Sequence, residues 1–185
     1  MQADFSVELG PDDETLTMPW AAPDGGPRYY DLKRHPEWIS QIEEAQREPE
    51  LASFLTALNS GALETAKCDA WFTPELNPEE DIFDASGKFG CYVDLLFSND
   101  EDRFSFPRHE ATAKRWVELL KRVPEIPASA EFLIRRCSFG EAAGFYFTLY
   151  VFGYGNDESQ ARRQWTIGLK LVENAIKQFS VLGRP

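Results

Sequence analysis

Apolar and polar residues alternate in four segments of this chain, and after the second and fourth of them apolar residues recur at helical spacing. Alternation at every second position is typical of a strand with one buried face, and spacings of three and four residues are typical of an amphipathic helix. The pattern therefore predicts strands over 65–73, 90–98, 130–139 and 145–154. It also predicts long helices over 107–122 and from a cap at 156–157 to about 180.

The predicted elements form two strand–strand–helix units, over 65–123 and 130–182. Trp116 and Trp165 stand at matching positions of the two helices, but little further identity links the units. Two readings stay open: a true internal duplication, or two hairpins that each need a helix to cover an apolar face.

The N-terminal part follows a different pattern. Residues 1–27 are punctuated by proline and by a Gly25–Gly26 pair, which predicts an irregular strap. Apolar spacing after Pro36 and Pro49 predicts two short helices within 36–59. We therefore expect one α+β domain over 1–185: an antiparallel sheet of at least four strands in two hairpins, with two long helices on one face, preceded by two short N-terminal helices. Edge-to-edge joining of the hairpins is assumed.

The second face of the expected sheet holds the candidate chemistry, because period-two alternation gathers charged groups between aromatic rings there. Such a face can bind a polar small molecule, or hold an acid–base pair if burial separates two carboxyl pKa values. It can equally be an ordinary solvent-facing surface with cross-strand ion pairs, or lie under the N-terminal helices. The candidate ligand-binding residues are Asp69, Trp71, Tyr92, Asp94, Arg135, Tyr146, Thr148 and Tyr150.

The formal net charge of −12 is unevenly distributed: residues 1–63 carry −8 and residues 64–185 carry −4. The segment 75–84 alone supplies −5, with apolar residues inside it. A solvated loop explains this segment simply, and a docking element for a basic partner explains it as well, with carboxylates steering the approach. The candidate docking residues are Glu79, Glu80, Asp81, Ile82 and Phe83.

Composition argues against several classes of protein. The acidic balance disfavours a nucleic-acid groove, no apolar run reaches the length of a membrane helix, and the acidic first residues do not resemble a secretory signal. Cys68, Cys91 and Cys137 have neither disulfide nor zinc spacing, which favours a cytoplasmic location. His35 and His109 are too far apart to suggest a metal site, and no cofactor loop is present: Gly153-Tyr154-Gly155 fits a turn.

These observations favour a non-catalytic cytoplasmic binding or protein-interaction domain. The alternative is a small-molecule-binding protein or enzyme that uses the second sheet face, with Asp69, Asp94 and Arg135 orienting a polar ligand. A homodimer through that face is a third hypothesis, because exposed aromatic surface often marks an interface.

Overall fold

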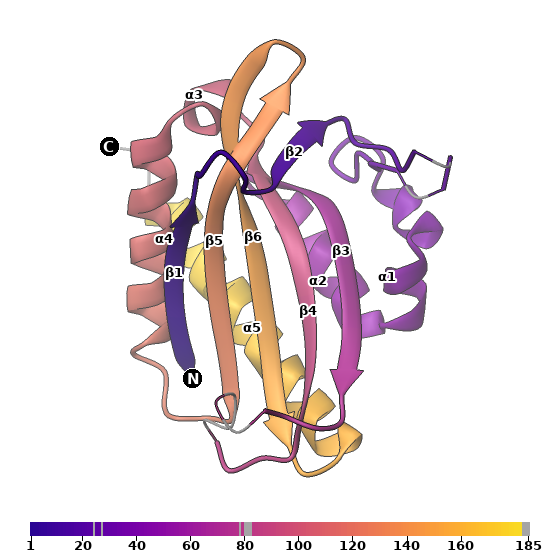
Figure 1. Ribbon diagram of the computed structural model, residues 1–185, viewed down its shortest axis with the longest axis vertical. Helices are drawn as coiled ribbons and strands as arrows, with labels where there is room; N and C mark the ends of the chain where they lie inside the picture. The colour runs from indigo at the N-terminus through magenta and orange to yellow at the C-terminus, as the bar shows by residue number, and fades with distance from the viewer. Residues whose placement is uncertain (24, 27, 78, 80–82, 183–185) are drawn as a thin grey trace.

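The structure is a computed structural model that describes residues 1–23, 25–26, 28–77, 79 and 83–182, with side chains as far as residue 178. A mixed sheet of six strands lies at its centre in the described part of the chain (Figure 1). The strands are β1 (Gln2–Glu8), β2 (Thr15–Met18), β3 (Leu63–Thr73), β4 (Gly87–Phe97), β5 (Ala128–Phe139) and β6 (Ala142–Gly155). Their order is β1-β5-β6-β4-β3, and β2 pairs with β5 beyond the end of β1.

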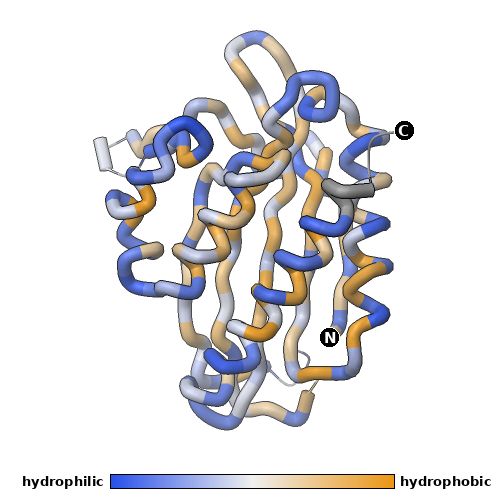
Figure 2. The backbone as a smooth tube through the Cα atoms, turned by 180° about the vertical axis from the view of Figure 1, so that it is seen from behind, coloured by the Kyte–Doolittle hydropathy of each residue, from blue (hydrophilic) through white to orange (hydrophobic). Residues whose placement is uncertain are grey.

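Three helices cover one face of the sheet (Figure 2). The longest, α5 (Glu158–Leu182), packs between α4 (Phe106–Leu120) and α2 (Pro49–Asn59). The remaining helical segments are η1 (Pro36–Gln41), α1 (Glu43–Arg47) and α3 (Asp100–Arg103). The main hydrophobic core lies between these helices and the sheet, around Trp116, Phe132, Phe147 and Trp165.

The expected antiparallel sheet with helices first in the chain is wrong. The chain begins with a strand, and both β1 and β2 run parallel to β5, while the remaining pairs are antiparallel. The segment Gln2–Glu8 alternates apolar Ala3, Phe5 and Val7 with polar residues, so it carries a strand pattern, although the prolines that follow suggest an irregular strap. The class remains α+β.

The two short N-terminal helices do not lie across the second sheet face. The first expected helix, which follows Pro36, divides at Ile42 into η1 and α1. Both lie beyond β3 at the edge of the sheet (Figure 1). Phe54 of α2 is buried in the main core on the helical side, and Trp38 packs against that core. Neither aromatic ring therefore fills the second face.

The part of the chain between β1 and η1, whose described residues within 9–35 we call the strap, covers one end of that second face instead. Leu16 and Met18 of β2 are buried there against Leu96, Cys137 and Tyr146, which makes a second, smaller core. Trp20 and Tyr29, further along the strap, pack on its rim. The opposite end of the same face is not covered by the described elements (Figure 1).

The outer edge of β3 is protected by side chains. Lys33 donates hydrogen bonds to three main-chain carbonyls, including that of Leu63, and Arg47 donates to the Ala70 carbonyl at 2.7 Å. The Asp69 carboxylate accepts from the Ala70 N–H. An exposed edge strand can pair with a strand of another molecule. These side-chain hydrogen bonds occupy main-chain groups of β3 and so protect that edge of the sheet.

Asn59 joins the end of α2 to the start of β3. Its amide donates to the Leu55 carbonyl at 2.8 Å and to Thr65 Oγ1 at 2.7 Å, and its oxygen accepts from the Thr65 N–H. We expect Asn59→Ala to lower the free energy of unfolding by about 2 kcal/mol, because buried partners lose their hydrogen bonds. Urea unfolding measures this. The adjacent exposed Ser60→Ala is the control, and equal stabilities of the two variants would contradict the role of Asn59.

Candidate functional site

All eight candidate ligand-binding residues lie on the sheet face opposite the long helices. The register shows this, because directly paired residues of antiparallel strands share a face. The pairs that place them are Asp69 with Tyr92, Asp94 with Thr148, Tyr92 with Tyr150, and Arg135 with Tyr146, while Trp71 follows Asp69 by two positions along β3. Alternation along each strand therefore predicted the shared face.

Burial divides these residues into two groups. Asp94, Thr148 and Tyr146 are 3%, 1% and 0% exposed and lie towards the end of the face that the strap covers. The side chain of Arg135 is 13% exposed beside them. Asp69 and the three aromatic residues lie towards the open end and are partly exposed. Only this second group is within reach of a partner in the structure described.

A continuous polar network crosses the sheet through Asp94, Thr148 and Arg135. Thr148 Oγ1 donates to Asp94 Oδ1 at 2.8 Å and accepts from an Arg135 Nη at 3.2 Å. Arg135 Nε donates to Glu8 of β1 at 2.7 Å, and its guanidinium lies 3.4 Å from Glu14 of the strap. Arg135 thus links four segments of the chain, which is a structural role for a residue expected to orient a ligand.

Burial also alters the ionisation of this group. Desolvation raises the pKa of Asp94 to about 7, although the hydrogen bond from Thr148 opposes the shift. Desolvation likewise raises the pKa of Tyr146, whose hydroxyl is buried without a hydrogen bond of ordinary geometry to the described residues. A carboxyl of this kind resembles those of active sites, but structural networks perturb pKa values in the same way.

The open end of the face carries an aromatic plateau, formed by Trp71, Tyr92, Tyr150 and Phe152. Neighbouring rings lie 6.0–6.5 Å apart between centroids, and Tyr150 and Phe152 are nearly parallel, at 8°. Gly90 lies beneath the Phe152 ring, since a Cβ at this glycine would be 2.2 Å from the ring. The missing side chain lets that ring lie flat on the sheet.

Carboxylates border the plateau on two sides. Asp4 and Glu131 are register partners on β1 and β5, next to Tyr150, and Asp69 lies next to Tyr92 on β3. Burial raises the pKa of Glu131, and the neighbouring charges of Asp4 and Glu8 raise it further. Among the described residues, neither Asp4 nor Glu131 has an ion pair. The anionic part of the rim is therefore formed by Asp4 and Glu131, because Asp69 is paired with Arg47.

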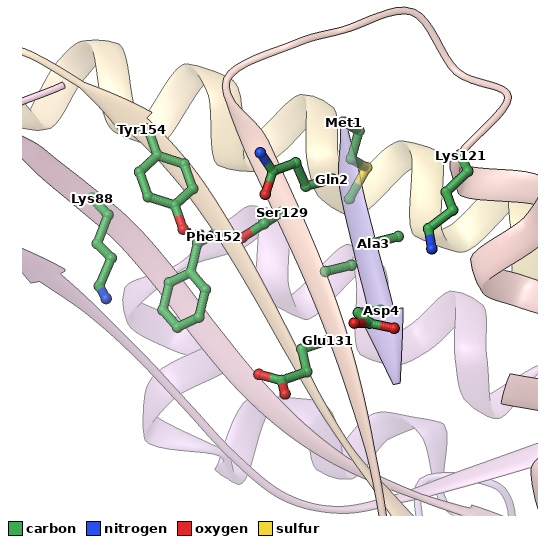
Figure 3. Close-up of a pocket in the computed structure, with 11 residues that line it drawn as sticks. Met1, Gln2, Ala3, Asp4, Lys88, Lys121, Ser129, Glu131, Phe152 and Tyr154 are labelled. Carbon is green, nitrogen blue, oxygen red and sulfur yellow. Dashed lines mark hydrogen bonds between the residues drawn. The ribbon is translucent and has the colours of Figure 1, made fainter. Parts of the chain in front are cut away.

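A shallow hollow of about 640 Å³ adjoins the plateau at β1 and β5 (Figure 3). Phe152 and Tyr154 line it on one side, and Asp4 and Glu131 on the other (Figure 3). The Lys88 ammonium lies 4.8 Å from the Phe152 ring centroid, a cation–π distance. The hollow therefore extends the plateau's surface of rings and charges.

A second depression, which we call the strap cleft, adjoins the plateau on the β3 side. It has a volume of about 680 Å³ and lies between the strap, α1 and β3. Trp20 and Tyr30 of the strap, Glu44 of α1, Asp69 of β3 and Tyr92 of β4 contribute to its lining. Asp69 and Tyr92 border both the cleft and the plateau, so the two features form one continuous surface.

The structure says little of the candidate docking loop. Glu80, Asp81 and Ile82 lie outside the described residues, and Glu79 is exposed. Phe83 packs against Tyr154, with ring centroids 4.9 Å apart, so this expected anchor contacts the end of β6. Its role in docking stays a prediction.

His109 stands in the first turn of the long helix expected over 107–122, a place that predicts a solvated side chain, and this expectation is wrong. The residue is fully buried, its Nδ1 lies 2.9 Å from the Ser105 carbonyl, and aromatic rings of the core surround it. Burial lowers its pKa. Within the described part of the chain, no three histidine, cysteine or acidic side chains are grouped as a metal site requires.

Sequence reasoning missed Phe152, Glu131 and Asp4 as members of the candidate surface. Phe152 and Glu131 follow the same alternation as residues that were selected, so that signal could have found them. Asp4 could be placed only by knowing that β1 pairs with β5. Trp20 reaches the surface through the path of the strap, for which the sequence contains no periodic signal, and Glu44 reaches it because α1 lies beyond β3 at the edge of the sheet.

Comparison with known proteins identifies no relative: no family model, curated protein or solved structure matches this chain. None of the described helices combines the length and the low polarity that a membrane-spanning helix needs. The function must therefore be argued from the surface itself.

Proposed function

We propose that this protein is a non-catalytic binding protein whose aromatic plateau docks a basic protein partner. The observation that carries the proposal is the plateau itself: four partly exposed rings on the open end of a sheet whose other end is buried under the strap. Aromatic residues dominate the energetically important centres of protein interfaces. A broad open face also suits a protein surface better than a small ligand, which is normally enclosed by its site.

The anionic rim supports a basic partner. Asp4, Glu131 and Asp69 border the rings, and the whole chain carries a net charge of −12. Two copies of this face would bring like charges together, which costs free energy, so a second copy of the chain fits the surface less well. The free thiols of Cys68, Cys91 and Cys137 support a reducing, cytoplasmic setting for the encounter.

Selection from a displayed library of random peptides on the full-length protein tests this function. We expect enriched peptides to combine arginine or lysine with aromatic or leucine residues. Trp71→Ala and Phe152→Ala should each weaken their binding by about tenfold or more, because truncating a central aromatic anchor costs about 2 kcal/mol. Fluorescence anisotropy measures the affinities, and added salt should reduce them.

The matched control is Phe104→Ala, because Phe104 is an exposed phenylalanine, 38% accessible, outside the plateau. It should leave the affinity unchanged, and circular dichroism should show that all variants fold. Selected peptides that bind Trp71→Ala as tightly as the unmodified protein would contradict the proposal. So would a stable dimer in sedimentation equilibrium that Trp71→Ala dissociates.

A further inference from the structure

We propose that the strap cleft is the anchor pocket of this docking surface and that it takes an arginine side chain of the partner. The inference rests on the proposed function and adds the chemistry of the contact. The cleft is continuous with the plateau through Asp69 and Tyr92. Its volume of about 680 Å³ exceeds what one arginine side chain fills, so neighbouring residues of the partner enter as well.

The walls of the cleft suit a guanidinium. Trp20, Tyr30 and Tyr92 contribute three aromatic rings to the lining. Cations of the chain already lie over the rings of Trp20 and Tyr30, which leaves Tyr92 as the ring on which a planar guanidinium stacks. The indole Nε1 of Trp20 is buried and has no acceptor among the described residues.

The charges of the cleft separate into engaged and unengaged groups. The Lys67 ammonium lies 3.4 Å from Glu14 and 5.5 Å from the Trp20 ring centroid, and Asp69 lies 3.1 Å from an Arg47 nitrogen. Arg28, the other cation of the lining, is exposed and lies over the Tyr30 ring. These groups already have favourable neighbours within the chain.

Glu43 and Glu44 differ, because neither has an ion pair with a described residue. Glu44 also lies close enough to Cys68 that, after burial, its charge is the largest influence raising the pKa of that thiol. Its carboxylate therefore lies near the inner wall of the cleft, where an incoming guanidinium can donate two parallel hydrogen bonds to the two carboxylate oxygens. Lysine would supply the charge without the planar fork.

The test uses the full-length chain, labelled with ¹⁵N, and an end-blocked tripeptide with central arginine. A second tripeptide carries citrulline in place of arginine, because citrulline has nearly the same shape and no charge. We expect the arginine peptide to shift the Trp20 indole and the Asp69 amide signals with millimolar affinity. The citrulline peptide and the Glu44→Gln variant should each bind about fivefold to tenfold more weakly, because a charge-assisted hydrogen bond is lost.

Glu118→Gln is the matched control, since Glu118 is an exposed acid of α4, paired with Arg115, on the helical side of the molecule. It should leave the titration unchanged. Three results would each overturn the arginine pocket. The first is that the arginine peptide causes no shifts. The others are that the citrulline peptide binds as tightly as the arginine peptide, or that Glu44→Gln binds the arginine peptide as tightly as the unmodified protein does.

The two proposals fail separately. Trp71 does not line the cleft, so Trp71→Ala should retain the tripeptide while losing the selected peptides. If the tripeptide binds but the selected peptides bind Trp71→Ala as tightly as the unmodified protein, the docking surface is rejected, and the anchor role of the cleft is rejected with it. Plateau-dependent peptides without tripeptide binding would reject the cleft alone.

Discussion

Replacing Gly153 by alanine is expected to lower the free energy of unfolding by more than about 3 kcal/mol, because a Cβ there would clash with the backbone of a packed helix. A Cβ at Gly153 would lie 2.0 Å from the Trp165 main-chain nitrogen and 2.4 Å from the Ala161 carbonyl oxygen. Both atoms belong to the backbone of α5, so no side-chain rotation relieves the clash. The helix would have to move away from β6.

That movement would open the main core. Trp165 is fully buried, its ring centroid lies 4.7 Å from that of Phe89, and its indole N–H donates to the Cys91 sulfur at 3.4 Å. Interiors are packed as tightly as organic crystals, so a displacement of this helix loosens many contacts at once. We therefore expect Gly153→Ala to reduce the urea midpoint strongly or to prevent folding.

Gly61→Ala is the matched control. Gly61 follows α2, and a Cβ there would meet only the Leu58 carbonyl oxygen, at 3.6 Å, which is an ordinary contact. Urea unfolding followed by tryptophan fluorescence compares the two variants. Equal stability of Gly153→Ala and Gly61→Ala would show that α5 does not approach β6 so closely.

Gly153 also shows how far sequence reasoning reached. The Gly153-Tyr154-Gly155 context predicts a turn at the end of the strand expected over 145–154, and β6 does end at Gly155. The close approach of α5 at this glycine could not be predicted, because it depends on how helix and sheet pack. Local patterns report the period of an element, whereas packing contacts join residues far apart in the chain.

The same distinction explains the errors in sheet topology. Alternation correctly predicted which face each residue of β4, β5 and β6 occupies. It could not show that β6 pairs with β4, or that β1 runs parallel to β5, because several strand edges carry equally suitable patterns. Pairing is decided by which edges complement one another once the chain is compact.

For the candidate site as well, the sequence predicts which residues share a face but not which of them are buried. The shared face of Asp69, Trp71, Tyr92 and Tyr150 follows from period two, but the burial of Asp94 does not. Burial there depends on Leu16 and Met18, in a four-residue strand too short for a periodic signal. The boundary between buried network and open plateau is therefore a property of the strap.

Asp94 should make the stability of the protein depend on pH. Burial raises its pKa in the folded state to about 7, whereas an unfolded aspartate titrates near 4. Below about pH 4 both states hold the proton. Between about pH 4 and pH 7 only the unfolded state loses it, so the free energy of unfolding should fall as pH rises through this window and then level off above about pH 7.

Asp94→Asn isolates this contribution, because its amide keeps an oxygen to accept the hydrogen bond from Thr148 and cannot ionise. We expect the variant to be about 4 kcal/mol more stable than the unmodified protein at pH 8, because a rise of the pKa from near 4 to about 7 corresponds to about this free energy, with the difference shrinking towards zero near pH 4. Urea unfolding at a series of pH values measures this difference. His109, whose pKa burial lowers, affects both proteins equally and cancels.

The control for this experiment is Ser6→Ala, in the neighbouring part of β1 and without an ionisable group. Its difference from the unmodified protein should not vary with pH. A constant difference for Asp94→Asn as well, or a variant that is less stable at pH 8 than at pH 4 relative to the unmodified protein, would show that folding does not raise the pKa of Asp94. In that case the charges of Lys67 and Arg135, which lower the pKa of this carboxyl, would offset the effect of its burial. The network beneath the strap would then be a set of charge pairs.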